Sequence, residues 1–353
     1  MSDKGLQHIK LLGIILAILT ALVAGHNQPA RAGKIDAAAF YQGKVVKLVV
    51  GYAPGGGYDI LARTLAPWIE QKTGATVVVE NRPGGGGLAA INQVVESTAD
   101  GLTIMLANGQ AAALAQLLEL EGVRFDLLRV PWLARVAVER NVLMVSKQSA
   151  YRSIADLQRA ADPIKWAGGG KADTMADTAA CVSEALGLKA KIIIGYKGSK
   201  EAALSTMRNE TDGIITTDSS ALGYVKGEDL LVPVAVLDRS RSPLFPDLPT
   251  VFESAELDKE HAWWIDYRAQ VAQIGRVLLT TPGTPGERVE FLTAAFREIL
   301  ADPAFTSESG AKGHTITYAS ADELRGLLRT TMQALNADQL ARVRSVVLEK
   351  YYR

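Results

Sequence analysis

Three glycine-rich stretches are the places in this sequence where residue types and spacing could bind a small molecule. They read APGGG at residues 53–57, PGGGG at 83–87 and GGG at 168–170. Glycine has no side chain, so a ligand can reach backbone N–H groups that other residues would cover. Where such a stretch precedes a helix, free N–H groups and the positive end of the helix dipole favour an anion. The three stretches therefore indicate anion binding by the backbone.

A nucleotide phosphate is one anion to consider, and the sequence argues against it. None of the stretches has Walker spacing, because Lys171 is followed by Ala172 rather than by serine or threonine. Residues 84–89 satisfy G-x-G-x-x-A only formally, and that pattern alone is weak. The acidic residue that would hold a ribose should end the next strand, where Ala107 and Asn108 stand instead.

Two of these observations also have simpler explanations, which the sequence leaves open. Glycines make tight turns without any ligand, although three such turns at equivalent positions favour binding. Asp59 stands at the start of a helical pattern, and we expect it to cap that helix at the rim of a pocket. Arg63, four residues later, is expected to pair with Asp59 on the helix surface.

Residues for catalysis or metal binding follow no recognised pattern. Two histidines, His261 and His314, lie beyond the N-terminal segment, and neither has the spacing of a metal ligand. The sequence has no H-E-x-x-H and no G-x-S-x-G. Its single cysteine, Cys181, is expected to be a small buried apolar residue. We therefore expect no enzyme, no metal and no cofactor.

The N-terminal segment is typical of an exported protein. Two lysines precede an apolar run at residues 11–24, and residues 30–32 read Ala-Arg-Ala, as at a signal-peptidase site. A membrane anchor is the alternative, but a spanning helix needs roughly 20 apolar residues. We predict that residues 1–32 are a cleaved signal peptide and that the mature protein is soluble. The 38 basic and 38 acidic residues balance, which argues against nucleic acid or an anionic membrane as partner.

Apolar, β-branched runs alternate with helical patterns, which indicates an α/β fold with largely parallel sheets. The predicted strands are 44–50, 76–80, 102–106, 142–145, 164–167, 191–194, 213–216, 231–236 and 276–280. The predicted helices are 60–72, 88–97, 154–160, 174–186, 201–208, 287–300 and 322 to the C-terminus. Each glycine stretch thus joins a strand to a helix, where ligands bind in such folds. Pro67 should kink or shorten its helix.

The length predicts two domains. No linker separates them, so the chain is expected to cross between them near residues 142–146 and 231–237.

Several longer stretches, in this order, resemble one family over nearly all of the chain after the signal segment. They are KLVVGYAPGGGYDILAR, VVVENRPGGGG, DGLT at 100–103, GYKGS at 195–199 and RSPLFPDLPT at 241–250. The chain resembles the extracytoplasmic solute receptors of tripartite tricarboxylate transporters. This resemblance implies a periplasmic binding protein of the two-lobed Venus-flytrap type, each lobe a mostly parallel sheet flanked by helices. The implied lobes are residues 33–142 with 238–353, and 143–237.

The resemblance also implies a ligand and the residues that bind it. Glycine loops in such receptors hold a ligand carboxylate, partly through water. The implied ligand-binding residues are Tyr52, Pro54, Gly55, Gly56, Asp59, Gly85, Gly86, Gly169, Gly170, Thr174, Tyr196, Lys197 and Asp218. The ligand would be a di- or tricarboxylate, an aromatic carboxylate or an acidic amino acid, which a monomeric receptor delivers to a permease. A sensor subunit docking on a membrane kinase, or a secreted hydrolase, is the alternative.

Three departures from the family pattern bear on the ligand or the hinge. The third glycine loop lacks the usual histidine, and Gly195 replaces a usual proline. Residues 265–276 form a longer stretch than usual, for which we expect an extra turn near the lobe boundary.

Overall fold

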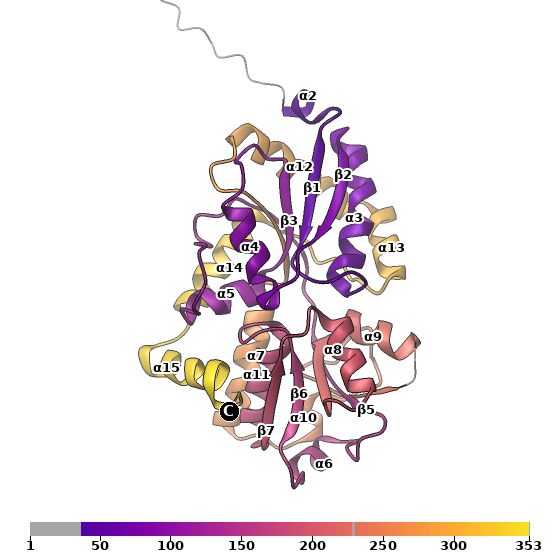
Figure 1. The fold of residues 1–353 in the computed structure, drawn as a ribbon, viewed down its shortest axis with the longest axis vertical. Helices are drawn as coiled ribbons and strands as arrows, with labels where there is room; N and C mark the ends of the chain where they lie inside the picture. The colour runs from indigo at the N-terminus through magenta and orange to yellow at the C-terminus, as the bar shows by residue number, and fades with distance from the viewer. Residues whose placement is uncertain (1–36, 228–229, 353) are drawn as a thin grey trace, which may run out of the picture. The chain divides into compact units, whose positions relative to one another are not determined.

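The structure is a computed structural model that describes residues 37–227 and 230–352. The predicted signal peptide lies outside the described residues. A short helix, α2 (Ala37–Tyr41), comes first, and from Tyr41 onward the chain forms one compact unit with two sheets (Figure 1). We call each sheet, with the helices packed on it, a lobe.

The first sheet has parallel strands on one side and antiparallel strands on the other. Its strands lie in the order β11 (Ala319–Ser320), β4 (Trp132–Ala137), β10 (Arg276–Thr280), β3 (Thr103–Asn108), β1 (Val45–Val50) and β2 (Thr76–Asn81). β1 pairs in parallel with β2 and β3, whereas β10 runs antiparallel to β3 and β4. The carboxyl ends of β1, β2 and β3 therefore share one edge.

The second sheet repeats this arrangement with five strands. Their order is β7 (Ala190–Ile194), β6 (Ile164–Gly168), β8 (Gly213–Thr217), β5 (Asn141–Ser146) and β9 (Leu231–Val236). β6 is parallel to β7 and β8, and β5 is antiparallel to β8 and β9. Both sheets are thus mixed, because the strands that enter each lobe from the other run against its parallel core.

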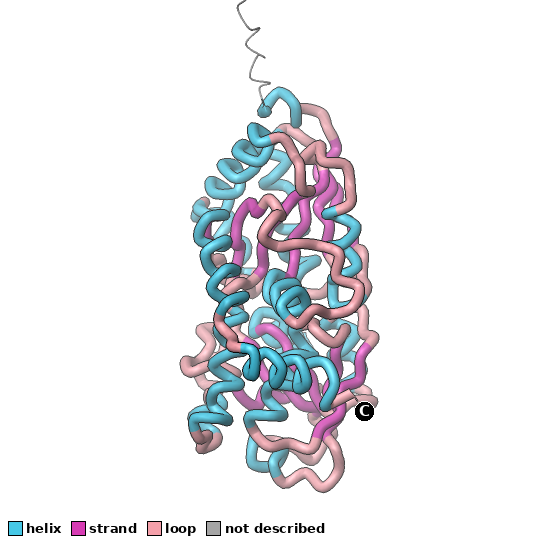
Figure 2. Tube along the Cα trace, turned by 90° about the vertical axis from the view of Figure 1, so that its left-hand side faces the viewer, coloured by secondary structure: helices cyan, strands magenta, loops and turns pink. Residues whose placement is uncertain are grey.

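Helices surround the strands of both sheets (Figures 1 and 2). Those of the first lobe are α3 (Gly57–Thr73), α4 (Leu88–Val95), α5 (Gly109–Leu117), α12 (Gly286–Ala301), α13 (Pro303–Ala311) and α14 (Ala321–Gln333). Those of the second are α6 (Ile154–Gln158), α7 (Thr174–Ala185), α8 (Ser199–Met207), α9 (Asp218–Gly227), α10 (Val251–Ser254) and α11 (Lys259–Ala272). Two last elements, α15 (Ala337–Ser345) and the π-helical turn η2 (Val346–Lys350), follow α14.

The nine predicted strands are all present, with small shifts at their ends. The strands β4 and β11 and the helices α2, α5, α9, α10, α11 and α13 were missing from the prediction. α3 continues to Thr73, so the predicted shortening at Pro67 is wrong. The single helix predicted from residue 322 to the C-terminus is also wrong, since it divides into α14, α15 and η2.

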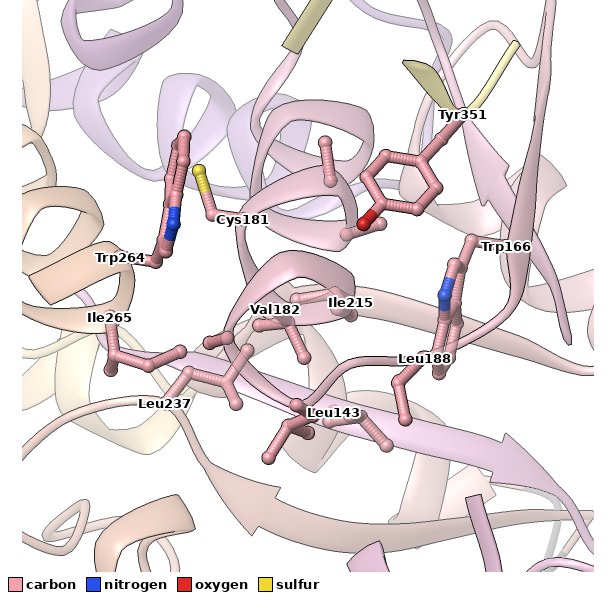
Figure 3. Packing of buried hydrophobic residues seen from close by; sticks show 14 of the residues in the cluster. Leu143, Trp166, Cys181, Val182, Leu188, Ile215, Leu237, Trp264, Ile265 and Tyr351 are labelled. Atoms are coloured by element: carbon pink, nitrogen blue, oxygen red, sulfur yellow. The ribbon is translucent and has the colours of Figure 1, made fainter. Parts of the chain in front are cut away.

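The core of the second lobe includes the C-terminal residues. Figure 3 shows Cys181 and Val182 of α7 between Trp264 of α11 and the rings of Trp166 and Tyr351. Cys181 is fully buried, as predicted, and burial raises the pKa of its thiol.

Hydrogen bonds hold the chain end in the second lobe. The carbonyl of Tyr351 accepts a hydrogen bond from the N–H of Ile192 (2.7 Å). The Tyr352 hydroxyl donates to the carbonyl of Lys171 (3.0 Å), and the Lys171 ammonium lies 5.4 Å from the centre of the Tyr352 ring. The C-terminal residues thus contact the third glycine loop.

The chain passes between the lobes at residues 138–140, between α11 and β10, and again between α14 and α15. The lobe boundaries at residues 142 and 237 stay a prediction.

Candidate functional site

Four loops that follow parallel strands meet around a small chamber. They precede α3 and α4 in the first lobe and α7 and α8 in the second. Because parallel strands end at one edge of each sheet, their following loops gather there.

Hydrogen bonds join these loops within and between the lobes. The Tyr52 hydroxyl donates to the carbonyl of Gly86 (2.9 Å), which ties the first glycine loop to the second. The side-chain amide of Asn108, at the end of β3, donates to the Tyr52 hydroxyl and to Thr174 Oγ1 of α7, both at 2.8 Å. The N–H of Ala53 donates to the carbonyl of Lys197 (2.9 Å). The two lobes are therefore in direct contact around the chamber.

Two glycines allow this close approach. Gly86 has φ +68°, and a Cβ there would lie 2.5 Å from Cβ of Asp173 in the other lobe. A Cβ on Gly170 would lie 3.0 Å from the carbonyl carbon of Gly85. The second and third glycine loops thus pack backbone against backbone, which a larger residue at either position would prevent.

Three helices begin at the chamber without a side-chain cap within the described chain. The residues before α3 and α8 are Gly56 and Gly198, and Asp173 before α7 makes no capping hydrogen bond. The first residues of each helix line the chamber. Because the first N–H groups of a helix have no intrahelical partner, three sets of donors and three positive dipole ends converge here. This arrangement is suited to an anion.

Acidic residues in the first turns of α3 and α8 reach backwards and leave these donors free. Asp59 accepts a hydrogen bond from the N–H of Gly55 (2.9 Å), and Glu201 accepts one from the N–H of Lys197 (2.7 Å). Both carboxylates accept hydrogen bonds from N–H groups that lie before the helix. The N–H groups that face the chamber are not used by them.

The chamber measures about 40 Å³. It is lined by Tyr52, Gly56, Gly57, Tyr58, Asn108, Asp173, Thr174, Met175, Ser199, Thr216, Thr217, Ser220 and Arg276. Since a buried water needs roughly 10–15 Å³, this space fits one carboxylate group or a few waters. The Tyr58 hydroxyl is buried and has no hydrogen-bond partner among the described residues, so a donor is available at the wall.

One buried ion pair links the chamber to the segment between the lobes. Arg276 Nε lies 2.5 Å from Glu139 Oε2, its Nη1 donates to the carbonyl of Gly57 (2.7 Å), and its guanidinium lies 4.3 Å from the Tyr58 ring centre. Burial opposes ionisation of Glu139, but the Arg276 guanidinium together with the neighbouring His314 and Ser219 outweighs it and lowers the pKa of the carboxyl to about 2. Glu139 thus compensates the charge of Arg276 beside the chamber.

Asp173 is the chamber residue whose pKa lies close to neutral pH. It is 2% exposed and accepts a hydrogen bond from the N–H of Gly169 (2.6 Å). Burial, assisted by the nearby Asp177 carboxylate, raises the pKa of Asp173 to about 7. Its carboxyl is therefore partly protonated at neutral pH, and the protonated form can donate a hydrogen bond.

The structure places the predicted site residues in different surroundings. Tyr52, Gly56 and Thr174 line the chamber, and Gly55 lines a neighbouring cavity. Gly85, Gly86 and Gly170 form the contact between the second and third loops, and Gly169 donates to Asp173. Pro54 and Lys197 are exposed, and Tyr196 is half-buried in an apolar cluster of the second lobe.

Asp59 and Asp218 do not border the chamber. α3 begins at Gly57, so the prediction that Asp59 is the N-cap is wrong. Its predicted pairing with Arg63 is confirmed at 3.0 Å. Asp218 accepts a hydrogen bond from Ser242 (2.6 Å), and burial raises its pKa to about 6.

Sequence reasoning missed most of the polar wall. The missed residues of the wall are Gly57, Tyr58, Asn108, Asp173, Met175, Thr216, Thr217, Ser220 and Arg276, whereas Ser199 belongs to the turn at residues 196–199 that the family resemblance implied. Asn108 and Asp173 carried a recognisable pattern, since one ends a predicted strand and the other follows the third glycine stretch. Arg276 carried none, because it lies at the start of its strand, far along the chain from the loops.

The longer stretch at residues 265–276 forms the second half of α11 and the start of β10. Its Arg268 pairs with Asp177 of α7 (2.6 Å) and donates to Gln110 of α5 (2.9 Å). This buried bridge joins helices of both lobes. The stretch therefore contributes a buried bridge between the lobes, and the extra turn stays a prediction.

Within residues 37–227 and 230–352, no helix combines the length and apolarity that crossing a bilayer requires. The same residues contain no group of three or more side chains that could hold a metal ion.

Comparisons with known proteins agree with this geometry. Residues 61–347 match the model of the tripartite tricarboxylate transporter family receptor. The curated protein BugT of Bordetella pertussis is 25% identical over 315 residues, which cover 88% of this chain and 90% of BugT.

Two solved structures show the same fold. The periplasmic binding protein BugD superposes with a TM-score of 0.74 at 23% identity, over 88% of this chain and 100% of that one. R. palustris Rpa4515 with adipate superposes with a TM-score of 0.72 at 20% identity, over 86% and 97%. The two-lobed binding-protein fold is thereby confirmed. Because the family model spans most of the chain, this protein belongs to the receptor family of the tripartite tricarboxylate transporters.

Proposed function

We propose that this protein is a periplasmic receptor that captures a small organic carboxylate between its lobes and delivers it to a tripartite tricarboxylate-type permease. The convergence of three uncapped helix starts on one chamber carries this proposal. Adipate in a protein of the same fold supports a carboxylate as ligand.

In this proposal one ligand carboxylate occupies the chamber. Backbone N–H groups at the starts of α3, α7 and α8 donate to its oxygens, and the Tyr58 hydroxyl adds a further donor. Protonated Asp173 donates to a second oxygen of the ligand. A di- or tricarboxylate exceeds the chamber, so it would hold the lobes further apart than they are here.

Ligand screening by thermal unfolding tests the binding step. A ligand at 100 times its Kd stabilises the folded chain by about 2.7 kcal/mol, and each kcal/mol raises Tm by roughly 2–4 °C at this size. Di- and tricarboxylates, aromatic acids and acidic amino acids form the panel. If none raises Tm, carboxylate capture is wrong.

A matched pair of variants then tests the chamber. Gly56 has φ −87°, so Gly56→Val is free of backbone strain, yet its branches stand among the ligand oxygens. Gly286 also lies at a helix start, and a Cβ there meets nothing within 4 Å. We expect Gly56→Val to abolish the ligand-induced rise in Tm and Gly286→Val to retain it. Unchanged binding by Gly56→Val would make Gly56 merely structural.

Delivery to a permease is tested by cross-linking in membranes with the stabilising ligand present. Recovery of permease subunits supports transport. Recovery of a sensor kinase without any permease subunit would replace transport by signalling, while leaving carboxylate binding intact.

A further inference from the structure

A second, larger cavity lies between the lobes beside the chamber. It measures about 320 Å³ and is formed by the start of α3, by α8 and α9, and by the loop before β11. Gly57 and Ser220 border both spaces. A Cβ on Gly57 would lie 2.8 Å from Ser220 Oγ and from Arg276 Nη2. Close packing at this point separates the larger cavity from the chamber.

The walls of this cavity are mainly apolar. Lys200, Ala203, Leu204 and Met207 line it and share one face of α8, since they are spaced by three and four residues. Across the cavity, Ile60 of α3 faces from the first lobe. Ile60 is 39% exposed and Leu204 is 37% exposed, which is high for large apolar side chains. An apolar ligand body would cover both.

A lysine without an ion-pair partner borders the same cavity. No ion pair or hydrogen bond of Lys200 is found within the described chain. Its Nζ lies 3.0 Å from the position of a Cβ on Gly55, so its ammonium stands beside the first glycine loop. Lys312, at another point of the wall, is engaged by Glu308 (2.7 Å) and Thr64 (3.1 Å). Lys200 is thus the cation left to receive an anionic group.

A buried histidine supplies an acceptor. His314 lines the cavity and is 1% exposed, and Nε2 has no hydrogen-bond partner among the described residues. Its Nδ1 lies 3.5 Å from Glu139 Oε1. Burial lowers the pKa of His314, so the ring is neutral at pH 7. With the ring proton on Nδ1 facing the Glu139 carboxylate, Nε2 is an acceptor.

We propose that this cavity is a second binding site, for an organic acid with an apolar ring or chain. Its carboxylate would pair with Lys200, its apolar body would cover Ile60 and Leu204, and a hydroxyl at the far end would donate to His314 Nε2. A volume of about 320 Å³ lies at the lower end of the range for small-molecule sites and fits a single-ring acid. Since both lobes form the cavity, its ligand favours their contact and is coupled to binding in the chamber.

The test measures binding of 4-hydroxyphenylacetate to the mature chain by ligand-observed NMR titration. Leu204→Asp places a charge in the apolar wall, and Lys200→Gln removes the cation. We expect each to raise the probe Kd by at least about tenfold. Leu128→Asp and Lys189→Gln are matched controls at exposed positions away from the cavity, and they should leave the Kd unchanged.

Three results would overturn the second site. The first is no binding at about 10 mM probe. The second is a Kd that Leu204→Asp leaves unchanged. The third is loss of probe binding in Gly56→Val, which would place the probe in the chamber. Retention of the probe by Gly56→Val supports a separate site, and weaker binding of phenylacetate supports the hydroxyl contact.

Discussion

The starts of α3, α7 and α8 at the chamber differ from most other helix starts of the described chain. Exceptions are α5, which is capped by the chamber residue Asn108, and α4 and α12, which are uncapped away from the chamber. Six helices away from the chamber begin with a side-chain cap; these are α6, α10, α11, α13, α14 and α15. In α14, for example, Ser320 caps the N–H of Glu323, and Glu323 reaches back to Ser320. At α3, α7 and α8 no such side-chain bond is made within the described chain.

Because of this difference, backbone N–H groups at the chamber remain available to a ligand. A polar cap contributes about 0.5–2 kcal/mol to stability relative to alanine. At the chamber the corresponding N–H groups keep their bonding capacity, so a bound anion can supply the missing acceptor. This difference can be tested by changing the residues at the chamber while the capped helices stay native, or by changing a capped helix while the chamber stays native.

The largest effect is expected when a chamber helix is given a cap of its own. Gly56→Asp places a carboxylate at the N-cap of α3, in backbone geometry that any residue adopts. Its oxygens would take the N–H groups that a ligand needs and would repel a ligand carboxylate. We expect calorimetry to show a loss of carboxylate affinity of about 100-fold or more, with Tm equal or higher. A variant that binds normally would show that the start of α3 does not hold the anion.

A smaller effect is expected from separating the second and third loops. Gly86→Ala combines a left-handed backbone with a 2.5 Å clash against Asp173. Gly187 has a similar φ of +62°, but a Cβ there meets nothing within 4 Å. Both alanine variants should lose about 1–2 kcal/mol of stability. Only Gly86→Ala should also weaken ligand binding, by about tenfold or more; equal effects of both variants on affinity would contradict loop contact as a requirement.

A third effect is the dependence of ligand affinity on pH. Because burial and the nearby Asp177 raise the pKa of Asp173 to about 7, an anionic ligand should bind the protonated form better. Affinity should therefore fall as pH rises above 7, by at most about tenfold per pH unit. The folded chain also holds this proton between the ordinary pKa of 3.8 and about 7, so Asp173 lowers stability as pH rises through that window. In the Asp173→Asn variant, ligand affinity and stability should both depend less on pH. If the pH dependence of affinity is unchanged in this variant, Asp173 is not the group that causes it.

The smallest effect is expected at a capped helix. Ser320→Ala removes the N-cap of α14 and should cost about 1 kcal/mol of stability, seen as a Tm lower by roughly 2–4 °C. Carboxylate affinity should stay the same. A change in affinity would show that capped and uncapped helix starts are not separate in function.

Much of the fold followed from the sequence because its strands are short, apolar and bounded by turn residues. The three strand–glycine–helix joints were predicted for the same reason. β4 escaped prediction because Arg135 interrupts its short apolar run, and β11 escaped because two residues leave no pattern.

The candidate site was predicted only in part, and for a physical reason. Glycine loops leave a local pattern, whereas Arg276 and Glu139 meet across 137 positions of chain through folding alone. Asp59 shows the opposite error. Its position next to the loop predicted a cap, but the helix begins two residues earlier and its carboxylate serves Gly55.

The contact between Tyr352 and the third glycine loop has a use in protein engineering. Glu349, in the preceding turn, is exposed, and the single native cysteine is fully buried. A cysteine introduced at Glu349 would thus accept a thiol-reactive dye selectively, close to the segment that touches Lys171. Rearrangement of that loop on ligand capture would alter the dye's surroundings, which makes the C-terminal turn an attachment point for a fluorescent biosensor.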